Sequence, residues 1–138
     1  MKMFRYVLLI FLACSLAMLG GCSPKPESTV EDFFWAVSKG ETDKAVALFS
    51  TNTAGAGDPQ MVAMFKSKLP AMVGEMKAQM DAKGGLKAVK ITKSEVASDG
   101  NSAHVEYTLT YGDDKGEVAG KGMDLVKEND QWKIKFGK

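Results

Sequence analysis

The sequence predicts an α+β domain in which N-terminal helices pack on a curved antiparallel sheet of about four strands. Residues 28–82 carry apolar side chains at helical spacings, whereas residues 86–136 alternate between apolar and polar side chains. Gly84 and Gly85 separate these two halves. Helices that all precede the strands are typical of α+β domains, and residues 28–138 are long enough for one such domain.

The helical half begins with two short helices. The first is expected to start at Ser28, in a capping box with Glu31, and to end at Gly40. A second helix is expected from Thr42 to Phe49, followed by a small, polar loop over residues 51–57. The apolar side chains of the first helix follow helical spacing: Val30, Phe33, Phe34 and Val37.

A third, longer helix follows. Asp58 and Pro59 form a strong helix start, with an N-cap residue before a proline of the first turn. Pro70 interrupts the pattern and predicts a kink or two consecutive helices. One face is lined by apolar residues, many of them methionines: Met61, Met64, Phe65, Leu69, Met72, Val73, Met76 and Met80.

The second half predicts an antiparallel meander. The first strand lies within residues 86–96, and strict alternation over residues 103–111 places Tyr107 and Tyr111 on one face and His104 on the other. A longer strand is expected over residues 117–127, with a bulge or bend at its glycines. Trp132, Ile134 and Phe136 alternate with lysines in the last strand.

The N-terminus has the features of an export signal. Lys2 and Arg5 precede an apolar stretch over residues 6–19, which is too short to span a bilayer with its flanks. The stretch closes on Leu19-Gly20-Gly21-Cys22, which resembles the lipobox of bacterial lipoproteins. The resemblance implies cleavage between Gly21 and Cys22, and a diacylglycerol on the Cys22 sulfur that anchors the protein in a membrane.

This resemblance divides the chain into a signal peptide (1–21), a lipidated tether (22–27) and the α+β domain (28–138). The tether contains two prolines, so it is expected to be short and stiff. Ser23 rather than Asp follows the lipidated residue. In Gram-negative lipoproteins this implies sorting to the outer membrane, so the expected location is the cell envelope, on the periplasmic face of that membrane.

Composition narrows the chemistry. Removing the signal would leave 16 lysines, no arginine and 17 acidic residues. A near-neutral, exported domain without arginine is a poor candidate for binding nucleic acid. Cys14 would leave with the signal and Cys22 would carry lipid, so neither a disulfide nor a thiolate is expected in the domain. No cofactor or metal ligand set is predicted.

The domain resembles the nuclear-transport-factor-2-like, or cystatin-like, superfamily, and within it the bacterial lipoproteins with a lumazine-binding-like domain of unknown function. The residues that carry the resemblance are Val30, Phe33, Ala36, Gly40, Ala45, Leu48 and Phe49, and the closing Asp130-Gln131-Trp132-Lys133-Ile134. The resemblance implies a cone-shaped fold with a cavity between helices and sheet, and a homodimer formed through the open sheet face. It implies no assigned activity.

A non-enzymatic binding module is therefore the favoured interpretation, with a small apolar or amphipathic ligand, or a protein partner, in a cavity rich in methionine and aromatic residues. The same side chains would equally close a solid core. The residues expected to line the pocket are Phe34, Met72, Met76, Tyr107, Tyr111 and Trp132.

Two alternatives remain. A ketosteroid isomerase-like enzyme would use Asp124 as base and Tyr107 as oxyanion donor. A copper protein would use the thioethers of Met72, Met76 and Met80. A separate pattern concerns the surface: lysines along the third helix and its end suit either solvent or anionic lipid headgroups. These lysines are Lys66, Lys68, Lys77, Lys83 and Lys87.

Overall fold

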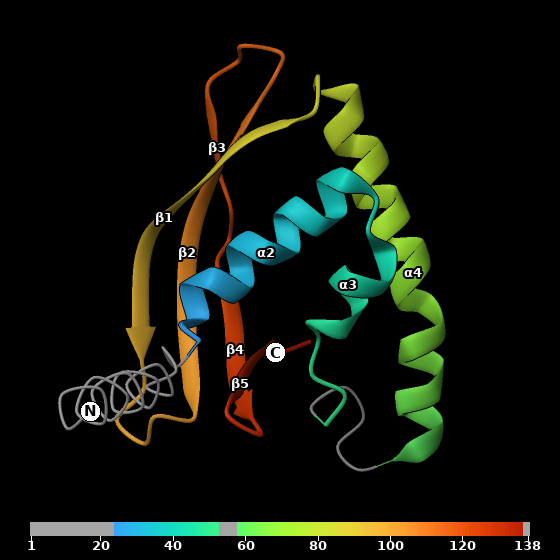
Figure 1. The fold of residues 1–138 in the computed structure, drawn as a ribbon, viewed down its shortest axis with the longest axis vertical. Helices are drawn as coiled ribbons and strands as arrows, with labels where there is room; N and C mark the ends of the chain where they lie inside the picture. The colour runs from blue at the N-terminus through green and yellow to red at the C-terminus, as the bar shows by residue number, and fades with distance from the viewer. Residues whose placement is uncertain (1–23, 53–57, 137–138) are drawn as a thin grey trace, which may run out of the picture.

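The computed structural model describes residues 24–52 and 58–136. Three helices precede five strands along the chain, as Figure 1 shows. The helices are α2 (Pro26–Lys39), α3 (Thr42–Ala47) and α4 (Pro59–Ala82). The strands are β1 (Leu86–Val96), β2 (Ser102–Tyr111), β3 (Glu117–Ala119), β4 (Met123–Glu128) and β5 (Gln131–Ile134).

The strands form one antiparallel sheet in the order β1-β2-β4-β5. The short β3 also pairs with β2, on the same edge as β4, so β3 and β4 act as one strand that bends between Ala119 and Met123. The predicted α+β architecture with about four strands and a bend near Gly120 is therefore confirmed.

The helices cover one face of the sheet. α2 crosses this inner face and contacts β1, β2 and β5, while α4 packs on α2 and α3 (Figure 1). Residues 48–50 cover the free edge of β5: Ile134 N donates to the Leu48 carbonyl at 2.8 Å, and Ser50 N donates to the Ile134 carbonyl at 2.8 Å. These bonds fix the C-terminal segment beside the helical layer.

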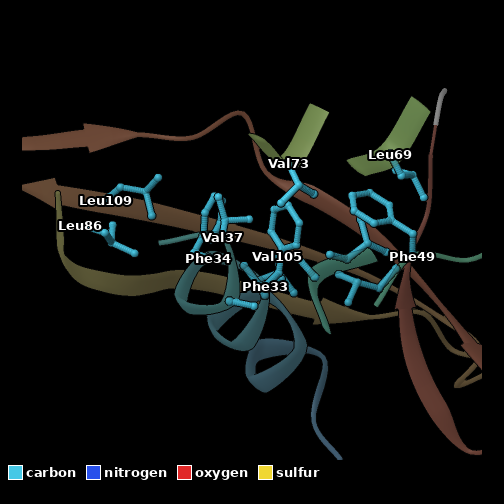
Figure 2. Packing of buried hydrophobic residues seen from close by; sticks show 14 of the residues in the cluster. Phe33, Phe34, Val37, Phe49, Leu69, Val73, Leu86, Val105 and Leu109 are labelled. Carbon is cyan, nitrogen blue, oxygen red and sulfur yellow. The ribbon is translucent and has the colours of Figure 1, made fainter. Parts of the chain in front are cut away.

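Figure 2 shows the buried core between helices and sheet. Phe33 and Phe34 from α2 meet Val105 and Leu109 from β2, and the Phe33 ring packs edge-on against Phe49 at 5.3 Å between centroids. The buried core runs from Val30 to Ile134, within the described residues. The domain thus carries its own hydrophobic core, and it can fold without the segment that precedes it.

Two helix predictions need correction. The first helix begins at Pro26, with Lys25 as N-cap and no side-chain cap, so the capping box of Ser28 and Glu31 is wrong. Proline suits the first turn because its missing N–H needs no partner there, and it starts the helix earlier. The end at Gly40 is confirmed: its φ of 74° is left-handed, and its N–H donates to the Val37 carbonyl.

The second correction concerns α4. It is one continuous helix across Pro70, not two. Pro70 is exposed, while Leu69 and Val73 on either side of it in sequence are buried and hold the helix against the core. The start is as predicted, because the Asp58 carboxylate accepts from Gln60 N at 2.9 Å.

The sheet has one apolar and one polar face, as the alternation predicted. Ala103, Val105 and Leu109 are buried on the inner face, while His104 and Asp124 pair across the outer face. Across the described residues, no helix is both long and apolar enough to cross a bilayer. The predicted cleavage and lipidation site at Gly21 and Cys22 lies outside the described residues.

Candidate functional site

An apolar groove runs along one flank of α4, between its first half and the C-terminal segment. Its volume is about 290 Å³. Three of its side chains are strongly exposed for apolar residues: Met61 by 48%, Met64 by 51% and Phe136 by 44%. We call this site the methionine groove; its lining residues are Met61, Met64, Phe65, Lys68, Leu69, Met72 and Phe136.

The groove exists because two segments meet there. On α4, side chains three and four residues apart share a face, which brings Met61, Met64 and Met72 into one row. The opposite wall is Phe136, whose ring packs on Phe65 at 4.3 Å between centroids. The bonds of Ile134 to residues 48–50 place Phe136 beside the helix.

The flank that carries the methionines changes character along α4. Glu75 and Gln79 follow Met72 by three and seven residues, so they continue the same flank. Both are exposed, as expected for a solvated helix surface. The fold therefore tolerates polar residues on this flank, and folding alone does not account for the methionines of the first half.

The residues predicted to line a pocket are distributed over the molecule rather than brought together. Met72 lies in the groove, while Met76 packs against the core. Phe34 is buried and contacts the half-buried Tyr107, at 4.6 Å between ring centroids. Tyr111 and Trp132 are buried, with Lys83 Nζ 4.8 Å from the Tyr111 centroid and Lys127 Nζ 5.6 Å from that of Trp132.

The two tyrosines are held in their neutral form. Burial, and then the neighbouring Tyr111, raise the pKa of Tyr107 above its usual value of 10.0. Burial, and then the charge of Asp113, raise the pKa of Tyr111 in the same direction. The ring of Tyr107 also lies so close to Gly120 that a Cβ there would overlap it. Tyr107 is therefore wedged between α2 and the bend of the sheet.

A second, shallower depression lies at one end of the outer sheet face. Its volume is about 670 Å³, and His104 Nδ1 lies 2.6 Å from Asp124 Oδ1 within it. Glu95 pairs with His104 across the neighbouring strand, and Lys135 completes the lining. The ring of His104 lies over Gly122, where a Cβ would overlap it.

This arrangement separates the groups that the enzyme alternative requires. Asp124 faces outward with His104, and its side chain is 58% exposed, whereas Tyr107 packs inward on Phe34. An acid and a tyrosine on opposite faces of a sheet cannot act on one bound substrate. Within residues 24–52 and 58–136, no three His, Cys, Asp or Glu side chains cluster as a metal site would require.

Sequence reasoning missed the second wall of the groove. It placed Phe136 in the last strand with Trp132 and Ile134, but β5 ends at Ile134 and Phe136 turns toward α4. The sequence offered one signal for the groove: the apolar face of this helix is wider than the face that a core needs. Met64 directly precedes Phe65, so it points to a different side of the helix from the buried phenylalanine.

Helices followed by a curled antiparallel sheet give this domain a fold similar to that of an NTF2-like protein of known structure. A candidate NTF2-like transpeptidase from Campylobacter jejuni has a similar structure, with a TM-score of 0.69 and 18% identity over 83% of this chain and 100% of that one. A SEC-C motif-containing protein from Rhodopseudomonas palustris is similar with a TM-score of 0.53 and 17% identity, over 89% of this chain and 84% of that one.

The chain belongs to the family described as Domain of unknown function (DUF4878), whose profile matches residues 20–135. Among curated proteins, no sequence matches this chain. The structural similarities lie below 20% identity, so they support the fold and leave the choice of function to the site.

Proposed function

We propose that this protein is an envelope lipoprotein, anchored through lipid on Cys22, whose NTF2-like domain is a non-enzymatic binding module. The methionine groove is its binding site, and it takes an apolar or amphipathic group. The lipobox-like Leu19-Gly20-Gly21-Cys22 supports export, lipidation and a place on the periplasmic face of the outer membrane. The relationship to lumazine-binding-like lipoproteins is part of this proposal and rests on the motif residues near both ends of the domain.

The observation that carries the binding role is the gathering of exposed apolar side chains in one place. Met61, Met64 and Phe136 are each 44 to 51% exposed, and all three line the same groove. Contiguous exposed apolar residues mark interaction sites more often than isolated ones do. Methionine side chains are flexible and polarizable, so they adapt to occupants of different shape.

The size of the groove limits what it can hold. Its 290 Å³ lies at the lower end of the range of about 300–1,000 Å³ for small-molecule pockets. A single hydrocarbon chain, one large apolar side chain or a small aromatic molecule fits this volume, whereas a dinucleotide-sized cofactor does not. Lys68 at its edge offers a positive charge to an amphipathic occupant.

Binding is tested on residues 23–138 with an uncharged apolar fluorophore, N-phenyl-1-naphthylamine. We expect saturable binding, weakened about tenfold or more by Met61→Gln with Met64→Gln, because the groove loses most of its exposed apolar area. The matched control is Val96→Thr with Val118→Thr, which alters equally exposed apolar residues outside the groove. Absence of saturable binding by the unmodified domain contradicts the binding role.

Lipidation is tested separately by mass spectrometry of the full-length protein purified from membranes. We expect the chain to begin at Cys22 and to carry a diacylglycerol mass there. The Cys22→Ser protein should keep residues 1–21. An unmodified Cys22 in a processed chain would remove the lipoprotein assignment and leave the groove experiment unaffected.

A further inference from the structure

We infer that the methionine groove is a docking surface for an anionic lipid bilayer. Met61, Met64 and Phe136 enter the boundary between headgroups and acyl chains, and Lys68 at the edge of the groove meets the phosphates. This inference rests on the proposed function, because it names a bilayer as the apolar partner of the same groove. Three observations support it: the charge of the first half of α4, which of its lysines have no carboxylate partner, and the shape of the groove.

The first half of α4 is basic as well as apolar. The first half of α4, residues 59–70, contains Lys66 and Lys68 but no aspartate or glutamate; the carboxylate of Asp58 precedes it as the N-cap. A helix that is apolar on one side, basic at its borders and free of acidic residues is typical of segments that lie in a membrane interface. The acidic residues of α4, Glu75 and Asp81, occur only in its second half.

The structure divides the five lysines of this region into two groups. Lys77 pairs with Asp81 at 2.7 Å, Lys87 pairs with Asp114 at 3.8 Å, and Lys83 lies over the ring of Tyr111. Lys66 and Lys68 are exposed, and neither has a carboxylate partner among residues 24–52 and 58–136. Of these two, Lys68 lines the methionine groove, whereas Lys66 lies on the opposite flank of α4 with Thr51 and Asn52. Lys68 is therefore the lysine placed to meet phosphates beside the exposed methionines.

The groove is open on the side away from the helix. Its lining outside α4, among the described residues, consists of Phe136 alone. A peptide helix laid in a groove needs apolar walls on both sides over several turns. A bilayer needs only projecting apolar side chains with positive charge beside them, and here Lys68 supplies that charge at the edge of the groove.

The position of the groove suits a protein tethered at Cys22. Only four residues lead from Cys22 to Pro26, where α2 begins, a span of about 14 Å when extended. The Thr29 hydroxyl of α2 donates to the Trp132 carbonyl of β5, and Phe136 follows four residues later. In Figure 1, the C-terminal segment lies between the start of α2 on the left and the first turns of α4 on the right.

The experiment uses residues 23–138, which contain no cysteine, so that a single cysteine can carry an environment-sensitive dye. Met64→Cys places the dye in the groove, and Val118→Cys places it on an exposed apolar position of β3. Each labelled domain is mixed at low salt with vesicles of equal parts phosphatidylcholine and phosphatidylglycerol. Vesicles of phosphatidylcholine alone serve as the neutral comparison.

We expect the dye at position 64 to shift to the blue on anionic vesicles only, and the dye at position 118 to remain unchanged. Lys68→Gln should lower partitioning about fivefold, which corresponds to about 1 kcal/mol for one lysine at a charged surface. The matched control is Lys66→Gln, which removes an exposed lysine from the opposite flank of the same helix and should change partitioning less than twofold. Salt of about 1 M, where the Debye length is about 3 Å, should also release the domain.

Three outcomes overturn the inference. The first is no spectral response of the dye at position 64, and the second is an equal response at positions 64 and 118. The third is an equal loss of partitioning in Lys68→Gln and Lys66→Gln. If the vesicles fail but N-phenyl-1-naphthylamine binds, the groove serves a soluble ligand and the proposed function stands. If both fail, the proposed function fails as well.

Discussion

Both halves of α4 carry methionines, but the methionines of the two halves differ in how far they are buried. In the second half, Met80 is 1% exposed and belongs to the core, and the flanking positions are the polar Glu75 and Gln79. In the first half, Met61 and Met64 are about half exposed, and residues 59–70 contain no acidic residue. The second half is built as an ordinary surface helix, whereas the first half keeps apolar residues that the core does not use.

The difference arises from what covers each half. The second half of α4 lies beside the end of α2 (Figure 1). The Lys77 side chain approaches Gly40 there. The first turns extend past α3, and Phe136 packs on Phe65 there. The apolar pattern in the sequence thus predicts which side of a helix is apolar, but how much of that side is buried depends on the elements that pack against it.

The largest expected effect separates a buried methionine from an exposed one. Met80→Ala should lower the free energy of unfolding by about 2–4 kcal/mol, because it leaves a cavity in the core. Met64→Ala, the same substitution at an exposed site, should change it by no more than about 0.5 kcal/mol. Urea unfolding followed by circular dichroism measures both. Equal losses would mean that Met64 also supports the fold.

The boundary between the halves gives the next largest effect. Pro70 lies inside α4 and is exposed, so Pro70→Ala restores a backbone hydrogen bond and removes a steric conflict with the preceding turn. We expect the unfolding free energy to rise by about 1–3 kcal/mol. Thermal unfolding measures the gain, and the probe affinity of the groove serves as control. A loss of stability would show that the packing of the first half on Phe136 and of the second half beside α2 depends on the proline.

A smaller gain is expected within the second half. Nothing lies within 4 Å of a Cβ built at Gly74, and the residue is helical, so Gly74→Ala should stabilise the domain by about 0.5–1 kcal/mol. Gly120→Ala is the contrasting control, because its Cβ would overlap the Tyr107 ring. The two alanine variants should shift the thermal midpoint in opposite directions; a shift of the same sign contradicts this placement of Tyr107.

The smallest effect concerns pH at the far end of α4, where Lys83 covers Tyr111. The pKa values of Tyr107 and Tyr111 are raised by burial, so above about pH 10 the unfolded chain loses its tyrosine protons before the folded one. The stability present below that pH should therefore fall as pH rises through the folded pKa values. Tyr107→Phe with Tyr111→Phe should flatten this fall in urea titrations, and Met64→Ala should leave it unchanged.

Local patterns in the sequence predict much of this fold. Asp58-Pro59 starts α4, Gly40 ends α2, and the alternation over β2 separates His104 from Tyr107, all as local backbone and side-chain preferences require. The capping box failed because a second local preference, proline at the first turn, placed the helix start at Pro26. Such conflicts between two local signals are hard to decide without the tertiary contacts.

The groove was not predictable in the same way. It depends on hydrogen bonds between Ile134 and residues 48–50, which are far apart in sequence, and on Phe136 leaving the strand pattern to meet Phe65. The methionine spacing predicted an apolar face of the helix, but it did not predict that Met61 and Met64 on this face stay exposed. The family match extends over most of the chain and supports the fold without indicating the groove.

The central claim is that Met61 and Met64 serve binding rather than folding. The most direct measurement compares urea unfolding and N-phenyl-1-naphthylamine binding of one variant, Met61→Gln with Met64→Gln, against the unmodified domain. We predict an unfolding free energy within about 0.5 kcal/mol of the original and a loss of saturable binding. A fall in stability of about 2 kcal/mol or more, with binding retained, would contradict the claim and assign these methionines to the core.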